Sequence, residues 1–500
     1  MSDLLLAIEL VFRVEILAVI FAACVFGIFA GAMPGISATV AVALMVPITF
    51  FMEPVAALAA IATAVAMAIF AGDLPGALLR IPGTPASAAY AEEAHEMTKK
   101  GQGATILTIS LYGSVMGGLV GTMALMFSAP FLARLSLEFQ FYEYFWLAAI
   151  GLSTAALVAS GKPAKGAISL CIGLILATVG LDLISGAPRF TFGTVALIEG
   201  INFIPVMIGV FAIAEVMRTL MNPPTTDISK IRIQNVDYPQ VRRTLWRYRG
   251  KLGVGAIIGT IVGALPGAGS DIAAWVSYGW AKKFSKTPEK FGTGHAEGIV
   301  AASCSNNAAT CSTWIPTLVF GIPGDSVTAI VIGVLFLKGL EPGPTIFVEN
   351  APLVYSIFVS FFVANIILIP VGLAAIKVSK QMLRVPPNVL MPIILIFTLV
   401  GAYAINNSML GIIIALSAGV LSFFMQENDF PVAPLILGLV MGSMLEITFM
   451  QGMIAKQGDL TAFFSRPIAG GLGTLTIMVW LSPLLMKIVK RLRKPKTGAA

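Results

Sequence analysis

The chain has 500 residues, of which 57% are hydrophobic and only 11% are charged. A soluble globular protein carries about 25% charged residues. This composition therefore excludes a soluble globular protein. Apolar runs of about 17–25 residues, each long enough to cross the hydrocarbon core of a bilayer, recur along the chain. The net charge of +7 lies mainly between these runs, which is the positive-inside pattern of membrane proteins. We therefore expect an all-α polytopic membrane protein embedded in the lipid bilayer, with no nucleic-acid partner.

The first half of the chain predicts a helical hairpin, a broken helix pair and four spans, at residues 14–50, 54–90, 104–128, 141–159, 165–184 and 196–219. Two Pro-Gly pairs interrupt this series, one in Gly31-Ala32-Met33-Pro34-Gly35 and one in Ile81-Pro82-Gly83-Thr84. Proline lacks a backbone N–H donor and clashes with the preceding turn, and glycine weakens a helix. Each pair therefore predicts the end of one helix and the start of the next.

The second half repeats this series after a basic connector. Its hairpin, broken pair and spans fall at 252–281, 297–335, 351–376, 388–404, 409–425 and 431–450, and an extra helix follows at 468–487. The breaks Gly263-Ala264-Leu265-Pro266-Gly267 and Ile322-Pro323-Gly324-Asp325 lie 232 and 241 residues after their first-half counterparts. Matching interrupted segments in two halves indicate the binding site of a secondary transporter.

The basic residues predict the topology, because they concentrate in the connector, in the C-terminal tail and in short loops that we place in the cytoplasm. The two halves then run in opposite senses, with the N-terminus outside and the C-terminus in the cytoplasm. We predict two inverted repeats with roughly 12 full spans plus re-entrant segments. The predicted divisions are a first inverted repeat at 1–221, a cytoplasmic connector at 222–250, a second inverted repeat at 251–466, and an extra C-terminal helix with a basic cytoplasmic tail at 467–500.

The four breaks predict a substrate site, because a helix that starts inside a membrane presents free N–H groups and a positive dipole end to an anion. Glycines let a ligand approach the backbone, and hydroxyls add donors. A single break would be explained as a packing kink, but four in matched positions favour a site. The candidate substrate-binding residues at the breaks are Gly35, Ser37, Thr39, Gly83, Thr84, Ser87, Gly267, Gly269, Ser270, Gly324 and Ser326.

Arg80 is a further candidate substrate ligand, because its planar guanidinium suits a carboxylate. The sequence leaves two other readings of Arg80 open, a structural partner for Asp73 or a residue that snorkels to the interface.

Asp73, Asp271 and Asp325 lie in the interrupted segments, where charged residues are costly and suggest ion coupling or gating. The alternative for Asp271 is that it caps the helix after the glycines. Asn306 and Asn307 belong to a polar stretch in an apolar helix, which predicts a coupling-ion site, with interhelical hydrogen bonding as the competing account.

No catalytic constellation is visible. Only two histidines are present, and His95 and Glu96 lack the second histidine of a zinc-protease motif. His295 begins the helix that follows the second hairpin, where we expect it at the cytoplasmic interface. The four cysteines show no paired spacing, so we expect buried free thiols. We therefore expect no enzyme, no metal site and no cofactor beyond Na⁺ or H⁺ as coupling ion.

Several motifs together resemble the TctA family, the large permease subunit of the tripartite tricarboxylate transporters. The motifs are Gly31-Ala32-Met33-Pro34-Gly35, Ile81-Pro82-Gly83-Thr84-Pro85-Ala86-Ser87-Ala88, Gly263-Ala264-Leu265-Pro266-Gly267, Asn306-Asn307, Gly321-Ile322-Pro323-Gly324 and Gly339-Leu340-Glu341-Pro342-Gly343-Pro344. The resemblance covers nearly the whole chain. It implies a bacterial inner-membrane permease that works with a small four-helix membrane subunit (TctB-like) and a periplasmic solute-binding protein (TctC-like), and that imports carboxylates with a cation gradient.

The chain departs from the family pattern at its acidic residues. Many members have a Gly-Gly-Ser-type stretch in place of Ala71-Gly72-Asp73, and small neutral residues in place of Asp271 and Asp325. We therefore expect a divergent branch whose substrate is a di- or tricarboxylate or a related organic anion. The alternative functions are a stand-alone ion-coupled carrier or exchanger without a binding protein. A channel is disfavoured, because the breaks indicate a closed site and not rings of pore-lining charge.

Overall fold

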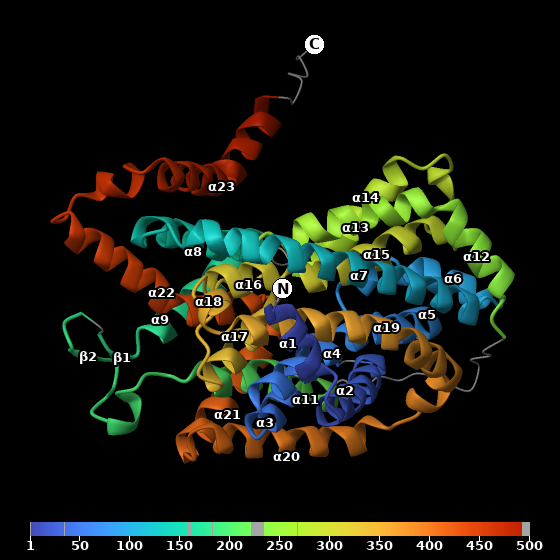
Figure 1. Cartoon of the computed structure of the whole chain (residues 1–500), viewed down its shortest axis with the longest axis horizontal. Coiled ribbons are helices and arrows are strands. Elements are labelled where there is room, and N and C mark those ends of the chain that lie inside the picture. Colours follow the sequence, from blue (N-terminus) through green and yellow to red (C-terminus); the bar gives the residue numbers. More distant parts are fainter. Residues whose placement is uncertain are drawn as a thin grey trace, which may run out of the picture.

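The computed structural model describes residues 2–34, 36–158, 162–182, 184–221, 235–267 and 269–492. These residues are almost entirely helical (Figure 1). The described ranges contain one small antiparallel sheet, in which β1 (Gly180–Leu181) pairs with β2 (Pro188–Arg189). Within these described ranges, seven helical segments are long and apolar enough to cross a membrane, judged by length and composition. The chain is thus a helical, multi-pass membrane protein, while the full count of about 12 spans remains a prediction from the sequence.

The helices of the first half follow the predicted segments closely. The hairpin consists of two helices, the broken pair contains a short second helix, and the last span includes a π-helical turn, η4 (Gly209–Ile213). The helices are α1 (Ser2–Val11), α2 (Val14–Ala32), α3 (Ala38–Phe50), α4 (Pro54–Ala71), α5 (Asp73–Leu79), α6 (Ala91–Lys99), α7 (Gly103–Ser136), α8 (Phe141–Val158), α9 (Pro163–Ala177), α10 (Phe203–Ile208) and α11 (Ala214–Met221), with 3₁₀ turns at Ser87–Ala89 and Val195–Leu197.

The second half has the same order of helices. Part of the predicted connector is helical, because the Asp237 side chain caps α12 by accepting a hydrogen bond from the Gln240 N–H at 2.9 Å; residues 222–234 lie outside the described ranges. The helices are α12 (Tyr238–Arg247), α13 (Arg249–Gly263), α14 (Gly269–Lys283), α15 (Ala296–Ser312), α16 (Trp314–Phe320), α17 (Ser326–Leu337), α18 (Ile346–Glu349), α19 (Ala351–Met382), α20 (Pro387–Asn406), α21 (Met409–Glu427), α22 (Ala433–Ala455) and α23 (Pro467–Leu492), with 3₁₀ turns at Pro288–Lys290 and Leu460–Phe464.

The two hairpins pack against the following helix through glycines at matching positions. A Cβ atom at Gly31 of α2 would lie 2.6 Å from the Ala68 carbonyl oxygen of α4. A Cβ atom at Gly263 of α13 would lie 2.5 Å from the Ala309 carbonyl oxygen of α15. These distances are shorter than van der Waals contact, so only glycine permits the helices to approach this closely. Gly263 lies 232 residues after Gly31, and Ala309 lies 241 residues after Ala68. The same two offsets separate the Pro-Gly motifs of the two halves.

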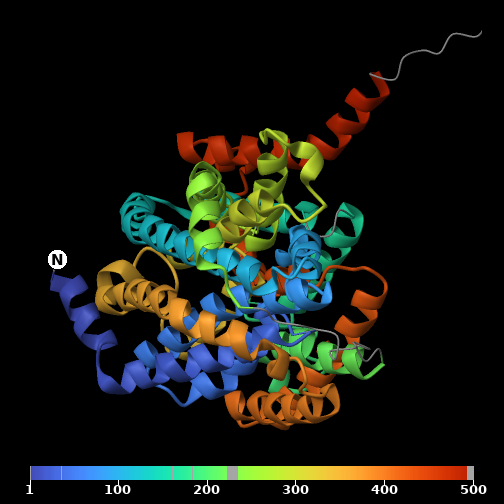
Figure 2. The same ribbon diagram turned by 90° about the vertical axis from the view of Figure 1, so that its right-hand side faces the viewer.

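Each half also contributes its last long helical segment to the other half. The segment 203–221 packs against α20 and α21, and α22 packs against α8 and α9. Close glycine contacts mark both packings, between Gly209 and Gly419 in the first and between Gly173 and Gly438 in the second. Likewise α7 packs against α15, and α19 packs against α4. The halves are therefore interlocked, and two large apolar clusters each contain buried residues from both halves. On its outside, α20 and α23 lie on opposite sides of the molecule in both ribbon views (Figure 2).

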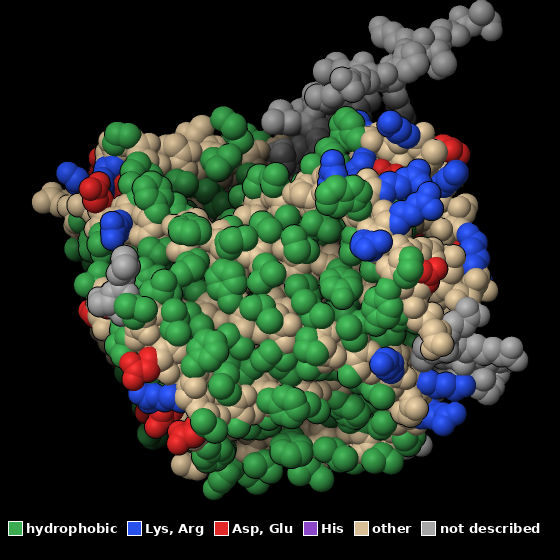
Figure 3. All heavy atoms as spheres, turned by 45° about the vertical axis from the view of Figure 1, so that its right-hand side comes forward, with side chains coloured by type: hydrophobic (Ala, Val, Ile, Leu, Met, Phe, Trp, Pro, Cys, Tyr) green, Lys and Arg blue, Asp and Glu red, His purple; other side chains and the backbone are tan. Residues whose placement is uncertain are grey.

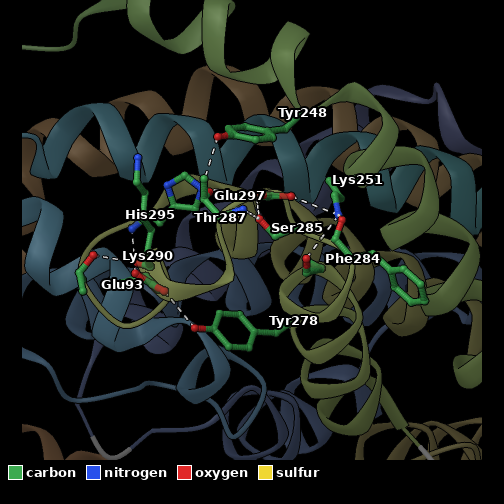
Figure 4. A network of polar contacts seen from close by, with 12 residues as sticks. Glu93, Tyr248, Lys251, Tyr278, Phe284, Ser285, Thr287, Lys290, His295 and Glu297 are labelled. Carbon is green, nitrogen blue, oxygen red and sulfur yellow. Dashed lines mark hydrogen bonds and ion pairs between the residues drawn. The ribbon is translucent and has the colours of Figure 1, made fainter.

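Two polar clasps tie a hairpin of one half to the other half. In the first clasp (Figure 4), the buried Glu93 carboxylate of α6 accepts hydrogen bonds from the Tyr278 hydroxyl and from the backbone N–H groups of Gly292, Gly294 and His295, at 2.5–3.0 Å. Gly292, Gly294 and His295 belong to the loop that joins α14 to α15.

In the second clasp, Lys338 at the end of α17 donates hydrogen bonds to the carbonyls of Phe50 and Met52, at 2.9 and 2.6 Å, in the loop from α3 to α4. The helices of the first clasp, α6 and α14, lie to the right in Figure 1, and those of the second, α3 and α17, lie to the left.

A broad hydrophobic surface separates two charged edges of the molecule (Figure 3). In this view one edge carries a dense group of Lys and Arg side chains, and the opposite edge carries side chains of both signs. Exposed Phe127, Phe131, Ile396, Phe424 and Trp480 belong to helices α7, α20, α21 and α23. A soluble protein rarely exposes so large an apolar area, so this surface is suited to contact with lipid.

Candidate functional site

A cavity of about 1190 Å³ lies where the helix breaks of the two halves meet. Pockets for small ligands usually measure about 300–1,000 Å³, so this volume is ample for a small organic molecule. The cavity gathers many of the residues that the sequence singled out, and all four breaks contribute to its wall. The predicted residues in the wall are Ser37, Thr39, Gly83, Thr84, Gly267, Gly269, Ser270, Asp271, Asp325 and Ser326.

The first break of each half precedes a helix, α3 in the first half and α14 in the second. Ser37 caps α3 by accepting a hydrogen bond from the Val40 N–H at 3.3 Å. In the second half, Gly267 and Gly269 have φ angles of 75° and 69°, which are unfavourable for residues with a Cβ atom. A Cβ at Gly267 would also lie 2.9 Å from the Gly151 carbonyl oxygen of α8. The glycines therefore let the chain turn against α8 before α14 begins.

The second break of each half has the same backbone construction. The helices α5 and α16 both end on a left-handed residue, Arg80 with φ 61° and Gly321 with φ 67°. Ile81 then donates its N–H to the Pro75 carbonyl and Ile322 to the Pro316 carbonyl, each at 3.3 Å. The breaks are therefore equivalent in geometry although their residues differ.

Reciprocal hydrogen bonds close each second break. In the first half the Thr84 N–H donates to Ser87 Oγ and the Ser87 N–H to Thr84 Oγ1, both at 3.1 Å. In the second half the Asp325 N–H donates to Thr328 Oγ1 at 2.9 Å, and the Thr328 N–H to Asp325 Oδ1 at 2.8 Å. Asp325 therefore forms a capping box for α17. Its carboxylate has a structural role in addition to its place in the cavity wall.

Asp271 links the two halves at the cavity. Its Oδ1 accepts a hydrogen bond from the Ala86 N–H, 3.1 Å away in the second break of the first half. The side chain thus does not cap its own helix by this contact, but satisfies a backbone donor of the opposite half. Its second carboxylate oxygen has no bond assigned among the described residues. Asp271 is exposed, so it is available to a ligand in the cavity.

The cavity contains charged residues that the sequence reasoning did not select. Arg218 and Glu215 of α11 and Glu427 at the end of α21 belong to its wall, together with Gln426 and Thr219. Arg218 is the one basic side chain among the described lining residues, which also include four acidic ones. Glu215 and Arg218 interrupt the apolar run 203–221 one helical turn apart, and this was the available signal. Both residues lie near the end of the predicted span 196–219.

A loop next to these residues is held by ionic contacts between the halves. Lys162 lies 2.6 Å from Asp429, and Lys165 donates a hydrogen bond to the Asn428 carbonyl. The hydrogen bond from the Lys162 ammonium lowers the pKa of the exposed Asp429 carboxyl below its usual value. This loop follows Gln426 and Glu427, so the contacts help to position one side of the cavity.

Other predicted site residues lie away from the described cavity wall. Arg80 points away from Asp73 and forms an exposed ion pair with Glu92 at 2.7 Å. Ser87 and Gly324 contact the backbone of the second breaks and do not line the cavity. The Ser87 hydroxyl donates a hydrogen bond to the Thr84 carbonyl, and Gly324 packs on Thr313. Gly35 lies outside the described residues.

The predicted ion-binding residues Asp73, Asn306 and Asn307 also lie outside this wall. Asn307 of α15 donates hydrogen bonds to the Ser114 carbonyl of α7 at 3.0 Å and to Asn365 Oδ1 of α19 at 2.8 Å. These contacts are the interhelical hydrogen bonds that the sequence offered as the competing account. Asp73 is buried in a separate polar cluster with Tyr90 and Ser110.

The remaining titratable residues form no metal site among the described residues. In these ranges no group of three or more His, Cys, Asp or Glu side chains is placed to hold a metal ion. The four cysteines are free, as expected, but Cys171 is exposed and only the other three are buried. Cys171 is exposed because α9 lies at the periphery of the bundle (Figure 1). His295 contacts Tyr248 and Glu297 beside the Glu93 clasp (Figure 4) and does not line the cavity.

Comparison with known proteins identifies the family. The family model described as "Tripartite tricarboxylate transporter TctA family" matches residues 17–437. The chain is 34% identical over 466 residues to an uncharacterized 52.8 kDa protein in the TAR-I ttuC' 3'region of Agrobacterium vitis, covering 93% of this chain and 92% of the relative. It is 36% identical over 228 residues to an uncharacterized protein in the TAR-II ttuC' 3'region of the same organism, covering 45% of this chain and 94% of that relative. No solved structure matches. The chain therefore belongs to the tripartite tricarboxylate transporter TctA family.

Proposed function

We propose that this protein is the permease subunit of a binding-protein-dependent, cation-coupled secondary transporter that imports a di- or tricarboxylate or a related organic anion. The observation that carries the proposal is the cavity at the junction of the four helix breaks, with contributions from both halves. In secondary transporters, substrate sites lie between repeats and are built from discontinuous helices. The TctA family membership supports a tripartite system with further protein components.

The matched contacts of the two halves support an inverted-repeat architecture. The glycine contacts, the left-handed helix ends and the capping boxes recur at constant offsets. With the basic loops in the cytoplasm, the two clasps would lie at opposite faces of the bacterial inner membrane. The N-terminus would be periplasmic and the C-terminus cytoplasmic, and exchange of the two repeats' conformations would give alternating access.

The charges of the cavity support coupling to a cation. A carboxylate substrate would meet Arg218, the hydroxyls of Ser37, Thr39 and Ser326, and the backbone of the re-entrant helices. Glu215, Asp271, Asp325 and Glu427 would repel the same substrate if all were ionised and uncompensated. Uptake of Na⁺ or H⁺ together with the substrate removes this repulsion. We therefore propose that the coupling ion neutralises acidic groups of the protein when the anion binds.

Uptake into proteoliposomes tests the proposal. Radiolabelled citrate, succinate and acetate are offered under imposed Na⁺ or pH gradients, with the permease alone or with the small membrane subunit and the binding protein. We expect gradient-driven uptake of a di- or tricarboxylate that needs both partners, and little uptake of acetate. Uptake by the permease alone would support the alternative, a stand-alone carrier. Absence of uptake of every organic anion with all partners present would contradict the proposal.

A further inference from the structure

A buried carboxyl group outside the cavity has only hydroxyl partners among the described residues. Asp73 is the first residue of α5 and is 5% exposed. The Tyr90 hydroxyl donates a hydrogen bond to Asp73 Oδ1 at 2.6 Å, and the Ser110 hydroxyl of α7 donates to Oδ2 at 2.5 Å. These contacts join three separate segments of the first half. Asp73 is absent from the described wall of the substrate cavity, so this cluster is a second polar location in the protein.

None of the charged groups on the surrounding elements has a contact with Asp73 among the described residues. The neighbouring cation in sequence, Arg80, pairs with Glu92. On α6, Glu93 binds the loop of the first clasp, and the His95 ring contacts the Ala77 carbonyl. The other titratable residues on elements that pack against α5 are Glu96 and Lys99 of α6, Tyr112 and Arg134 of α7, and Glu15 and Cys24 of α2; α4 and the 3₁₀ turn Ser87–Ala89 carry none.

A carboxylate in this position would be a buried charge without a counter-charge. Such a charge costs several kcal/mol even after the surroundings relax, and in a membrane it is rarer still. The two hydroxyl donors offset a part of this cost. A proton on the carboxyl group removes the buried charge itself.

The neighbouring Asn306 side chain of α15 does not supply a counter-charge either. It interacts with the Tyr90 hydroxyl and is 1% exposed, but an amide is neutral and cannot compensate a carboxylate. If Asp73 Oδ1 carries a proton, it can donate that proton to the Tyr90 oxygen, so the contact between the two side chains persists in the neutral form.

We propose that Asp73 is a proton-binding site of this permease, separate from the substrate cavity. Proton uptake forms an O–H bond at Asp73 with a proton supplied by water, and release breaks that bond and returns the proton to water. The carboxylate left behind accepts both hydroxyl hydrogen bonds. The inference deepens the proposed function, on which its coupling role rests, by adding Asp73 as a carrier of H⁺ outside the cavity, in addition to the cavity carboxylates.

A proton fits this cluster better than a metal ion. The oxygens of Tyr90 and Ser110 lie at direct hydrogen-bond distance from the carboxyl oxygens, so no metal ion fits between them. The equivalent position in the second half is Trp314, 241 residues later. The proton site is therefore confined to the first half.

Infrared spectroscopy of the purified protein tests the protonation itself, without transport. We expect the spectrum at neutral pH to contain the carbonyl stretch of a protonated carboxyl group, and Asp73→Asn to remove it. Asp429→Asn, which changes an exposed and ion-paired carboxylate, is the matched control and should leave the band in place. A band of unchanged intensity in Asp73→Asn, or one that Na⁺ displaces in the wild type, would overturn the proposal.

Uptake measurements test the coupling. Asp73→Asn should lose the component of uptake driven by a pH gradient and retain exchange of internal for external substrate, because the neutral amide mimics the protonated state. Unchanged pH-driven uptake would contradict coupling through Asp73. If the wild type transports no organic anion, the proposed function fails, while the infrared result still decides the proton site. If Asp73→Asn does not fold, Tyr90→Phe serves instead and should shift the carboxyl band; an unshifted band would also count against the site.

Discussion

The two second breaks of this protein share a backbone and differ in chemistry. Helices α5 and α16 both end on a left-handed residue and are followed by reciprocal caps at the same offset of 241 residues. The residues at these equivalent positions, however, are Arg80 against Gly321, Asp73 against Trp314, and Thr84 against Asp325. The left-handed helix ends and the reciprocal caps determine the backbone of each second break, and both features are the same in the two halves. The charged groups differ between the halves, and we predict from this difference that the halves act differently on ions and substrate.

The first breaks repeat this contrast. Ser37 and Thr39 of the first half occupy the positions of Gly269 and Asp271 in the second. All four line the cavity. At these first breaks, a substrate would therefore meet hydroxyl groups from the first half and a carboxylate from the second. Three sets of variants test how far the two halves are equivalent.

The glycine contacts of the two hairpins should give the largest effects. Gly31→Leu and Gly263→Leu each force a side chain against a carbonyl oxygen of the neighbouring helix. Overpacking costs typically about 1–3 kcal/mol, and more where backbone must move, so we expect both variants to lose most of their folded yield to a similar extent. Yield and monodispersity in detergent provide the measurement. Gly279→Leu is the control, because nothing lies within 4 Å of a Cβ at that position. If only one of the two variants lost its folded yield, the packing of α2 on α4 would not be equivalent to that of α13 on α15.

The two clasps should give intermediate effects of unequal size. Glu93→Gln weakens charge-assisted bonds to three backbone N–H groups, and we expect a loss of about 2 kcal/mol. Lys338→Met removes two bonds to carbonyls in a part-buried position, with an expected loss of about 1 kcal/mol. Thermal unfolding in detergent ranks the variants. Glu96→Gln, in a solvent-accessible pair with Lys99, should leave stability nearly unchanged, because exposed ion pairs contribute little. A larger effect of Lys338→Met than of Glu93→Gln would contradict this ranking.

The left-handed helix ends should respond differently to substitution, and Arg80→Gly should have the smallest effect of all these variants. Gly321→Ala places a Cβ on a residue with φ 67° and within 2.9 Å of the Pro342 carbonyl oxygen, so we expect a loss of about 1–2 kcal/mol. Arg80→Gly removes a similar strain and also an exposed ion pair worth about 0–1 kcal/mol. We therefore expect it to be neutral or slightly stabilising in the same unfolding assay. Clear destabilisation by Arg80→Gly would mean that the Arg80–Glu92 pair outweighs the backbone strain.

The sequence predicted the helix order and the break positions well, because Pro-Gly pairs act locally. The ends of α2, α13 and α17 fall within a few residues of the predicted ones. The side-chain partners depended on packing that no local pattern reports. Arg80 turns to Glu92 because its backbone is left-handed, and Asp73 meets Ser110 only when α5 packs on α7.

Arg218 illustrates the same limit at the cavity. It reaches the wall because the last helical segment of the first half packs against α20 and α21 of the second. From the sequence alone, a basic residue near the end of a span is read as an interface residue. Whether the lining residues bind substrate remains a prediction.

The most direct test of the account is binding of the transported anion to Arg218→Gln and Arg80→Gln, measured by isothermal titration with purified permease. We propose that the substrate binds in the cavity between the halves, where Arg218 is the basic residue among the described lining residues. Loss of a charge-assisted bond of about 1.5–3 kcal/mol predicts at least tenfold weaker binding in Arg218→Gln and less than about a twofold change in Arg80→Gln. Weaker binding in Arg80→Gln with normal binding in Arg218→Gln would contradict the account.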